Sequence, residues 1–382
     1  MPNKTTKLLM IPNTLSTFGG GERFVLETAK MLGNNIDITI INPTSDKDIK
    51  RIELKDLTKE YPEGYLIKDI NCYSTYIKRG NFLLMAPTVN GSVELSKAIY
   101  NTDVIYEVSV NPFLLASSII FAKLYGKRFI LDLGNPLLLN ERNSSLTFNL
   151  LQGLLLNTVS EIHAQTPTQL KKLKELNYRG KIWFIEHPVW EKQYYKNKEA
   201  HKEFRCLWVG RMTYQKGLMD LRIIIERVIA KNRKIIFNIV GSGEDQQLFR
   251  AWASKYPGQI RYYGFVSDEI LEELYQTSDL FINTSFYESP GIVFIEANAH
   301  GLPIIAWDVV GPKDVIRTKE QGTLIQGNST ATGSIAFAEA IIAESKLKKS
   351  TRRKEKIKRI INELYSRELF KKKFKEMVEW RA

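Results

Sequence analysis

The sequence predicts a protein of the α/β class, with two domains that each hold a parallel sheet between helices. Its 382 residues exceed what one hydrophobic core usually supports, so two domains are expected. Short apolar runs that suit buried strands alternate with segments of helical period in both halves of the chain. Glycine-rich loops follow directly after strands, and this order is typical of parallel sheets with crossover helices.

The N-terminal half opens with an expected strand over Lys7–Ile11 and a turn-rich stretch over residues 12–21. Apolar residues from Phe24 to Leu32 then recur at helical spacing, and Gly33 ends that segment. An alternating strand follows over residues 36–41. The further expected elements of this half are strands over 104–106, 129–131 and 161–164 and a helix over 114–125.

A second cycle of strand, glycine loop and helix begins at Phe204. Its expected strands cover 204–209, 234–240, 280–283 and 303–306, and its first helix covers 218–230. The polar, irregular stretch from His187 to Lys202 is the best boundary between the two halves. The sequence is therefore divided into domains over residues 1–188 and 204–355, and the segment 356–382 is set apart as a C-terminal helix.

The formal charge of +13 is concentrated at the C-terminal end of the chain. Residues 345–382 hold fifteen Lys and Arg against five Glu, and their apolar residues recur at helical spacing. The basic balance therefore describes this tail more than the rest of the chain. The two cysteines, Cys72 and Cys206, cannot form a disulfide framework, so a reducing compartment is the default. No apolar run reaches the ~20 residues that a membrane span needs.

The most informative segment covers residues 285–303. A buried strand ends before it, the chain turns through Ser289 and its neighbours, and the following helix stops at Gly301. Glu288 lies in the turn, and Glu296 lies about two turns later. The free amides and the positive dipole end of the helix would hold a phosphate with a carboxylate on each side. An ordinary strand-to-helix turn is the alternative, which the small residues and the companion loops disfavour.

A second candidate loop, Gly210–Gly217, follows directly after a strand and carries Arg211 and Lys216. A guanidinium fork and an ammonium point charge together suit a diphosphate whose leaving oxygen gains charge. A solvated basic loop is an equally open interpretation of this segment alone. Glycine loops at Gly19–Gly21 and Gly241–Glu244 would let the backbone approach a ligand closely, and a flexible turn stays open for both.

Together these motifs resemble the retaining glycosyltransferases of family 4, which have the GT-B fold of two Rossmann-like domains facing a central cleft. The likeness covers nearly the whole C-terminal half. It is weaker in the N-terminal half, where Gly20-Gly21-Glu22-Arg23 is similar to the family's glycine loop. The region around Tyr365-Ser366-Arg367 resembles the helix that crosses back to the first domain. The resemblance therefore implies an enzyme that transfers a sugar from a nucleotide-sugar donor.

The resemblance also implies roles for the residues that match family motifs. Arg211 and Lys216 would bind the diphosphate, and Glu296 would hold the ribose hydroxyls. Glu288 would contact sugar hydroxyls and stabilise the cationic sugar ring in the transition state. Glu288, Arg211 and Lys216 are thus the expected catalytic residues. The other expected donor-binding residues are Gly20, Gly21, Gly243, Phe265, Val266, Ser289, Gly291 and Ile292.

The acceptor side departs from the family pattern. Many members carry a histidine near the end of the strand over residues 129–131, and this chain has Asp132 and Asn135 in that region. Both are named as acceptor-side residues. Pro290 stands where the signature turn often has an aromatic residue, and Glu186-His187-Pro188-Val189 replaces a commoner linker pattern. The donor is therefore left as a UDP- or GDP-linked sugar, and the acceptor as a glycan, a lipid-linked molecule or another hydroxyl compound.

No cofactor and no catalytic metal are expected. The four histidines form no metal-binding pair, and Asp46-Lys47-Asp48 lies in a polar loop without a following apolar strand. In the family the departing phosphate is thought to accept the proton of the acceptor, so the resemblance implies no dedicated base. The expected location is the cytoplasm. Any membrane contact would be peripheral, through the basic tail on an anionic lipid surface. Packing of the tail's apolar face against the protein itself is an equally open interpretation.

Two other functions stay open. The same architecture would serve a sugar-nucleotide epimerase or hydrolase, whereas a glycoside phosphorylase would need a cofactor-bearing lysine that the sequence does not show. A basic nucleic-acid-binding protein is the alternative of another class. It is disfavoured because the excess charge lies on one tail, without a stacking platform or a known module, so nucleic acid is not an expected partner.

Overall fold

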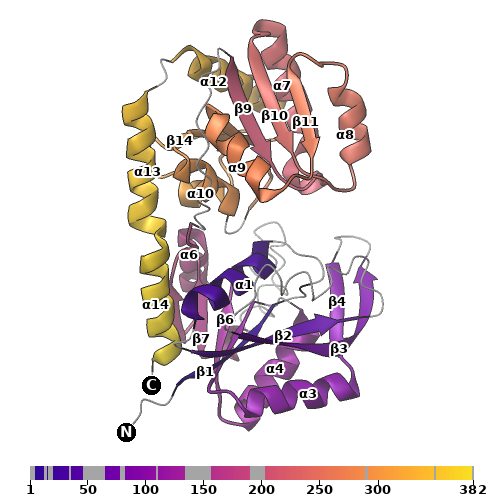
Figure 1. Ribbon diagram of the computed structural model, residues 1–382, viewed down its shortest axis with the longest axis vertical. Helices are drawn as coiled ribbons and strands as arrows, with labels where there is room; N and C mark the ends of the chain where they lie inside the picture. Colours follow the sequence, from indigo (N-terminus) through magenta and orange to yellow (C-terminus); the bar gives the residue numbers. More distant parts are fainter. Residues whose placement is uncertain are drawn as a thin grey trace. The chain divides into compact units, whose positions relative to one another are not determined.

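The computed structural model divides into two compact units. It describes residues 5–12, 15, 20–33, 36–45, 65–77, 82–108, 111–133, 156–189, 203–288, 291–347 and 350–380. The first unit comprises Met1–His187 together with Glu368–Ala382, and the second comprises Pro188–Arg367. Each unit is a sheet with helices packed on it (Figure 1), and each is described separately below.

The first unit is built on an eight-stranded sheet of order β4-β3-β2-β1-β5-β6-β7-β8. All neighbouring strands are parallel except β3 and β4, which form an antiparallel pair. The strand order reverses between β1 and β5, so the loops that follow these two strands start from the centre of one sheet edge. The strands are β1 (Lys7–Ile11), β2 (Asp37–Thr44), β3 (Tyr65–Ile77), β4 (Phe82–Pro87), β5 (Val104–Glu107), β6 (Arg128–Asp132), β7 (Glu161–Ala164) and β8 (Lys181–Phe184).

Helices cover both faces of this sheet. On one face, α3 (Val89–Tyr100), α4 (Pro112–Leu124) and α6 (Pro167–Glu175) bury their apolar residues against alternate strand residues such as Ile105 and Leu131. On the other face lie α1 (Gly20–Leu32) and α14 (Arg367–Glu379). Ring contacts join these two helices and the sheet: Phe24 with Phe370 at 5.7 Å, and Tyr106 with Phe374 at 5.0 Å between centroids.

The second unit has a six-stranded, fully parallel sheet of order β11-β10-β9-β12-β13-β14. Numbered within the unit this order is 3-2-1-4-5-6, the arrangement of a Rossmann fold, with its reversal between β9 and β12. The strands are β9 (Phe204–Val209), β10 (Ile235–Val240), β11 (Ile260–Gly264), β12 (Leu280–Asn283), β13 (Ile304–Trp307) and β14 (Gly322–Ile325).

Two apolar layers enclose the second sheet. The layer on one face includes Trp208 and Phe237 of the strands and packs against α7, α8 and α12. The opposite layer includes Leu207 and Phe281 and packs against α9, α10 and α13. The helices are α7 (Leu218–Lys231), α8 (Gln246–Ala253), α9 (Asp268–Thr277), α10 (Ile292–Ala299), α11 (Pro312–Val315), α12 (Ala331–Lys346) and α13 (Thr351–Tyr365), with a 3-10 turn, η4 (Tyr214–Lys216), before α7.

The tail differs from the single helix that the sequence predicts over residues 356–382. It forms two helices, α13 and α14, because Ser366 has an extended backbone conformation that interrupts the helical hydrogen bonds. The buried residues of α13 belong to the second unit and those of α14 to the first. Arg128 of β6 caps the C-terminus of α14. Its guanidinium donates to the carbonyl oxygens of Met377 (3.0 Å), Val378 (2.9 Å) and Trp380 (2.6 Å). A cation at this position satisfies carbonyl groups that a helix C-terminus leaves unpaired.

Candidate functional site

The expected donor-site residues of the second unit gather around the carboxyl ends of β9 and β12. These strands are neighbours at the point where the strand order reverses, the place where open α/β sheets commonly bind ligands. The loop over residues 210–217 leaves β9, and the segment that begins at Thr284 leaves β12. Parallel pairing therefore brings together two motifs that are about 70 residues apart in the sequence.

The two loops touch each other closely at Gly217. This glycine has φ +63°, and a Cβ atom there would lie 2.0 Å from the carbonyl oxygen of Thr284. The hydroxyl of Thr284 donates to the carbonyl oxygen of Lys216 at 2.9 Å, and the amide of Phe286 donates to the carbonyl oxygen of Gln215 at 3.0 Å. Only glycine fits between the two loops, so this close contact sets the position of the preceding residue, Lys216.

The side chains of Lys216 and Glu288 form an ion pair at this junction. Both are mostly buried, and the ammonium of Lys216 donates to Oε1 of Glu288. The hydroxyl of Ser285 donates to the same carboxylate oxygen at 2.7 Å. Ser285 is fully buried and its amide donates to Asn283 Oδ1 at 2.9 Å, so the turn itself holds the carboxylate in place.

The backbone around Glu288 depends on a residue that the sequence analysis missed. The amide of Glu288 donates to the carbonyl oxygen of Val310 at 3.0 Å. The next residue, Gly311, has φ +101°, and a Cβ atom there would lie 2.5 Å from Cβ of Glu288. The dipeptide Gly311-Pro312 after an apolar strand was the available signal for a turn at this position.

The N-terminus of α10 follows this carboxylate. Gly291 is the N-cap residue with φ +73°, and Ile292 is the first residue of the helix. The first amides of a helix have no partner inside the helix and carry its positive dipole end, so they suit an anion. Ser289, the remaining expected donor contact of this turn, lies outside the described residues.

Glu296 lies on α10 and is held by neighbours that the sequence analysis did not name. Tyr275 of α9 donates to its Oε2 at 3.0 Å. The ring of His300 stacks on Tyr275 with 4.9 Å between centroids, and its Nε2 lies 2.7 Å from Glu272 Oε1. Because Nδ1 of His300 lies 2.7 Å from the carbonyl oxygen of Glu296, the ring joins α9 to α10. An aromatic and a histidine on separate helices give no local sequence signal for such a contact.

The remaining expected residues of this unit lie at the ends of β9, β10 and β11. Arg211 is exposed and forms no ion pair with a described residue. The turn around Gly243 is bonded to Met212, which donates to the carbonyl oxygen of Ser242 at 2.9 Å. Phe265 is largely exposed after Gly264, whereas Val266 packs against the apolar layer of α9 and α10.

The other expected site residues belong to the first unit. Gly20 and Gly21 are the first two residues of α1, and no atom lies within 4 Å of a Cβ placed on Gly21. Asn135 and the Asp46–Asp48 segment lie outside the described residues. Asp132 ends β6, and its carboxylate is fully buried.

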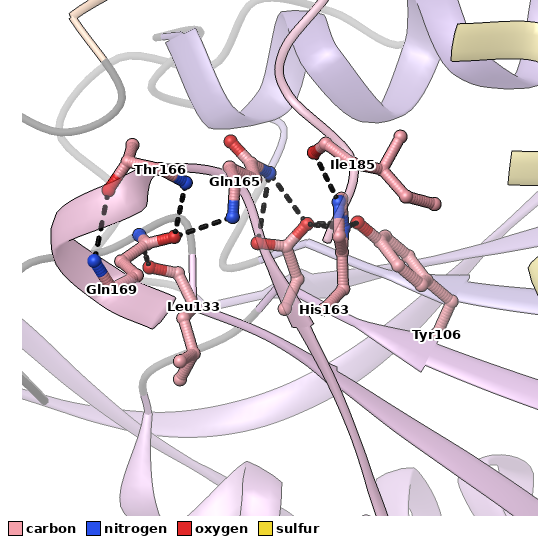
Figure 2. A network of polar contacts seen from close by, with 8 residues as sticks. Tyr106, Leu133, His163, Gln165, Thr166, Gln169 and Ile185 are labelled. Atoms are coloured by element: carbon pink, nitrogen blue, oxygen red, sulfur yellow. Dashed lines mark hydrogen bonds and ion pairs between the residues drawn. The ribbon is translucent and has the colours of Figure 1, made fainter. Parts of the chain in front are cut away.

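Asp132 is part of a buried network of polar side chains (Figure 2). Gln165 donates to both of its oxygens, at 3.0 and 2.8 Å, and the hydroxyl of Tyr106 donates to Oδ2. His163 Nδ1 lies 3.1 Å from Oδ2, and its Nε2 lies 2.8 Å from the carbonyl oxygen of Ile185. Since a carbonyl oxygen only accepts, Nε2 of His163 carries a proton. Burial and the charge of Asp132 raise the pKa of Tyr106 well above its usual range.

This network holds the ends of β5, β6 and β7 to the segment that leaves β8. Gln169 adds a bond from its amide nitrogen to the carbonyl oxygen of Leu133, at 2.6 Å. It also completes a capping box with Thr166 at the start of α6. Asp132 therefore positions the backbone at the end of β6; a direct contact with an acceptor stays a prediction. Its partners Tyr106, His163 and Gln165 were not predicted from the sequence.

The described residues contain no cluster of three or more His, Cys, Asp or Glu side chains arranged to hold a metal ion. None of the helices in the described ranges combines the length and apolar character of a transmembrane span.

The second unit is similar to a known family of enzymes. Residues 191–362 match the family model described as "Glycosyl transferases group 1". An uncharacterized glycosyltransferase of Methanocaldococcus jannaschii is 32% identical over 123 residues, 31% of each chain. The amylovoran biosynthesis glycosyltransferase AmsD of Erwinia amylovora is 32% identical over 154 residues, 40% of this chain and 42% of that protein. The matched region thus spans less than half the length of these relatives.

Solved structures extend the likeness to the fold of the whole chain. Anabaena HepE in complex with UDP superposes with a TM-score of 0.72 at 15% identity, over 98% of this chain and 99% of that chain. S. aureus TarM superposes with a TM-score of 0.73 at 13% identity, over 98% of this chain and 100% of that chain. The chain therefore has the GT-B fold, and its residues 191–362 match the model of the group 1 glycosyl transferases.

Proposed function

We propose that this protein is a retaining glycosyltransferase that moves a sugar from a nucleotide-sugar donor to a hydroxyl group of a glycan, a lipid-linked molecule or another acceptor. The observation that carries the proposal is the Lys216–Glu288 pair beside the N-terminus of α10. It sets a cation, a carboxylate and helix amides at the strand-order reversal of a glycosyltransferase domain.

Each part of this arrangement has a role in the proposed reaction. The diphosphate of the donor would accept hydrogen bonds from the first amides of α10 and from Lys216 and Arg211. As the sugar–oxygen bond breaks, negative charge grows on the leaving phosphate, and the same cations stabilise it more strongly than in the ground state. Glu288 would bind sugar hydroxyls and stabilise the positive charge that develops on the ring.

The nucleoside part of the donor would lie along the neighbouring strand ends. Glu296 offers two carboxylate oxygens to the ribose hydroxyls, and Tyr275 holds one of them in a defined orientation. The segment Gly264–Val266, in which Phe265 is exposed, would provide backbone groups for the base. Anabaena HepE has been solved with UDP and with UDP-glucose, so we propose a UDP-linked sugar as the first donor to test, with GDP-linked sugars as the alternative.

We propose further that the departing phosphate accepts the acceptor's proton on the same face of the sugar, which gives retention without a dedicated base or a metal. Two protein cations and a helix N-terminus supply the neutralising charge. Activity should then persist in EDTA. Abolition by the chelator with recovery on Mg²⁺ or Mn²⁺ would contradict this part of the proposal.

A screen of nucleotide sugars for thermal stabilisation is the experiment that tests donor use. A ligand that binds only the folded state raises its apparent stability. The donor found in this way is then incubated with candidate glycan acceptors, and the anomeric configuration of the product is read by NMR. Product of inverted configuration would reject the retaining mechanism, and the absence of stabilisation by any nucleotide sugar would reject the donor site.

A GT-B epimerase or hydrolase is the second candidate, because its donor site would need the same groups. It differs in requiring no acceptor. Conversion of the donor at the same rate with and without an acceptor would favour it over transfer. The glycosyltransferase domain itself makes nucleic-acid binding the weaker interpretation of the basic tail.

A further inference from the structure

The solvent face of α4 is apolar along the whole helix. Phe113, Ile120 and Leu124 are each more than half exposed, at 54%, 62% and 68%. They recur at helical spacing, and Ala116 and Ser117 complete the same face without a charged group. Helices on the surface of globular proteins normally place charged and polar residues there, so burial in this unit does not explain the pattern.

The neighbouring helix α3 continues this apolar surface. Val89, Val93 and Tyr100 are exposed at 77%, 46% and 63% and lie along one face of α3. The two helices meet near their C-terminal ends, where the ring of Tyr100 lies 5.3 Å from the ring of Tyr125. Ser96 and Tyr125 are joined there by a 2.7 Å hydrogen bond. We call the exposed set the α3–α4 face; it consists of Val89, Val93, Tyr100, Phe113, Ile120 and Leu124.

Basic residues border the α3–α4 face. Lys123 directly precedes Leu124, and the ammonium of Lys127 lies 5.7 Å from the centroid of the Tyr100 ring. The sequence contains no Asp or Glu from residue 108 to residue 131. The one acidic residue of the two helices, Glu94, is neutralised by Lys97 at 2.9 Å. The border is therefore cationic, and its charge is carried on flexible side chains that can extend away from an apolar centre.

We propose that the α3–α4 face binds the interfacial region of an anionic lipid membrane. Its apolar centre would enter the boundary between headgroups and acyl chains, while Lys123 and Lys127 contact anionic headgroups. A second copy of this chain fits less well, because self-association through this face would bring its lysines together without carboxylates to oppose them. An anionic lipid surface complements both the apolar centre and the positive border.

This assignment places the membrane contact on α3 and α4 and not on the tail, for which the sequence left lipid binding and packing against the protein equally open. The apolar residues of α14, which include Phe370 and Phe374, are buried on the opposite face of the sheet from α3 and α4. The apolar face of α14 is thus occupied inside the first unit and cannot enter a lipid layer. The lysines of α14 remain as a charged surface, because no large apolar side chain of this helix is exposed.

Vesicle co-sedimentation of the full chain tests the proposal. The vesicles are phosphatidylcholine alone and phosphatidylcholine mixed with phosphatidylglycerol. We expect binding to the mixed vesicles that weakens with salt. The triple variant F113S/I120S/L124S should bind about a hundredfold more weakly, since each exchange removes a large apolar side chain from the lipid contact. The variant K123Q/K127Q should lose the preference for the anionic lipid.

The matched control is K371Q/K372Q, which removes two lysines from the tail, as K123Q/K127Q does beside α4, and leaves the α3–α4 face intact. It should retain most of the binding. Loss of binding in this control with full binding of F113S/I120S/L124S would overturn the proposal, as would a wild-type chain that binds neither kind of vesicle. Stabilisation by a nucleotide sugar reports the second unit separately and should be unchanged in all variants.

A fluorescent reporter gives a direct readout of insertion. In I120W the new indole lies at the centre of the α3–α4 face, and six native tryptophans supply the background signal. Mixed vesicles should shift the added emission to shorter wavelength as the indole leaves water. An unshifted difference spectrum under conditions where the protein sediments with vesicles would show that another surface makes the contact.

Discussion

Lys216 and Glu288 form a mostly buried ion pair across 72 residues of sequence. Each belongs to a loop at the carboxyl end of a central strand, and the hydroxyl of Ser285 donates to the same carboxylate oxygen as Lys216. A donor diphosphate would compete with Glu288 for the Lys216 ammonium. The two charges therefore serve both the contact between the two loops and the proposed stabilisation of the leaving group.

Removing the cation should reduce turnover as well as donor affinity. We expect K216M to lower kcat by about 10²–10³-fold. The change removes an ammonium group that would stabilise the negative charge developing on the leaving phosphate, at a mostly buried position. R211Q should lower kcat less, since Arg211 is exposed. K231M, a change of an exposed lysine on α7, is the control and should be silent. Wild-type kinetics in both K216M and R211Q would reject the diphosphate assignment.

Glu296 should contribute to donor binding more than to the chemical step. E296A removes two acceptor oxygens for the ribose and should weaken donor affinity by about 1–3 kcal/mol. Y275F leaves the carboxylate in place but removes its 3.0 Å hydrogen bond, so we expect a smaller loss of about 1 kcal/mol. Isothermal titration with the donor measures both, with E339A on the exposed part of α12 for comparison. Equal donor affinity in E296A and wild type contradicts the ribose role.

Gly217 should be required for the contact between the two loops. G217A places a Cβ atom 2.0 Å from the Thr284 carbonyl oxygen at a backbone angle that alanine disfavours. The loops must separate, and we expect a loss of about 1–3 kcal/mol in stability with impaired donor binding. G258A is the matched control, because a Cβ atom there meets nothing within 4 Å. Thermal unfolding compares the two; equal midpoints would show that the loops can adjust without cost.

Glu107 should make the first unit less stable as pH rises. It ends β5, is fully buried, and neither carboxylate oxygen has a hydrogen-bond partner of good geometry among the described residues. Burial raises its pKa from 4.5 to about 8, against a smaller opposing effect of the Ser118 hydroxyl. In the unfolded chain Glu107 therefore loses its proton at a lower pH than in the folded chain. The free energy of unfolding falls as the pH rises from 4.5 to about 8, and this group does not change it outside that range.

The variant E107Q removes this titration and keeps the shape of the side chain. We expect it to stabilise the first unit by about 1–3 kcal/mol near pH 8 and to change little near pH 4. Unfolding midpoints measured across this range provide the test, with E376Q on the exposed side of α14 as the control. A pH profile of E107Q that parallels wild type would show that Glu107 is not the group responsible.

Much of the fold could be predicted because its strands are short, apolar and bounded by glycine or polar turns. Residues 206–208 of β9 and the whole of Leu280–Asn283 are buried, and the apolar composition of these runs alone identifies them. β3 was missed because it mixes charged, polar and apolar residues and pairs with β4 in an antiparallel arrangement. Composition there does not separate a strand from a loop.

The sequence by itself determined the local chemistry of the candidate site: two cations in a loop after a strand, and two glutamates around a helix start. It could not determine which of these charges meet, because strand order decides this and pairing between β9 and β12 is long-range. Tertiary structure also supplied Gly311 beside Glu288, Tyr275 beside Glu296, and the network around Asp132. It decided the use of the tail as well. The periodicity of residues 345–382 shows an apolar face, but only packing tells whether protein or lipid covers it, and in α14 the protein does.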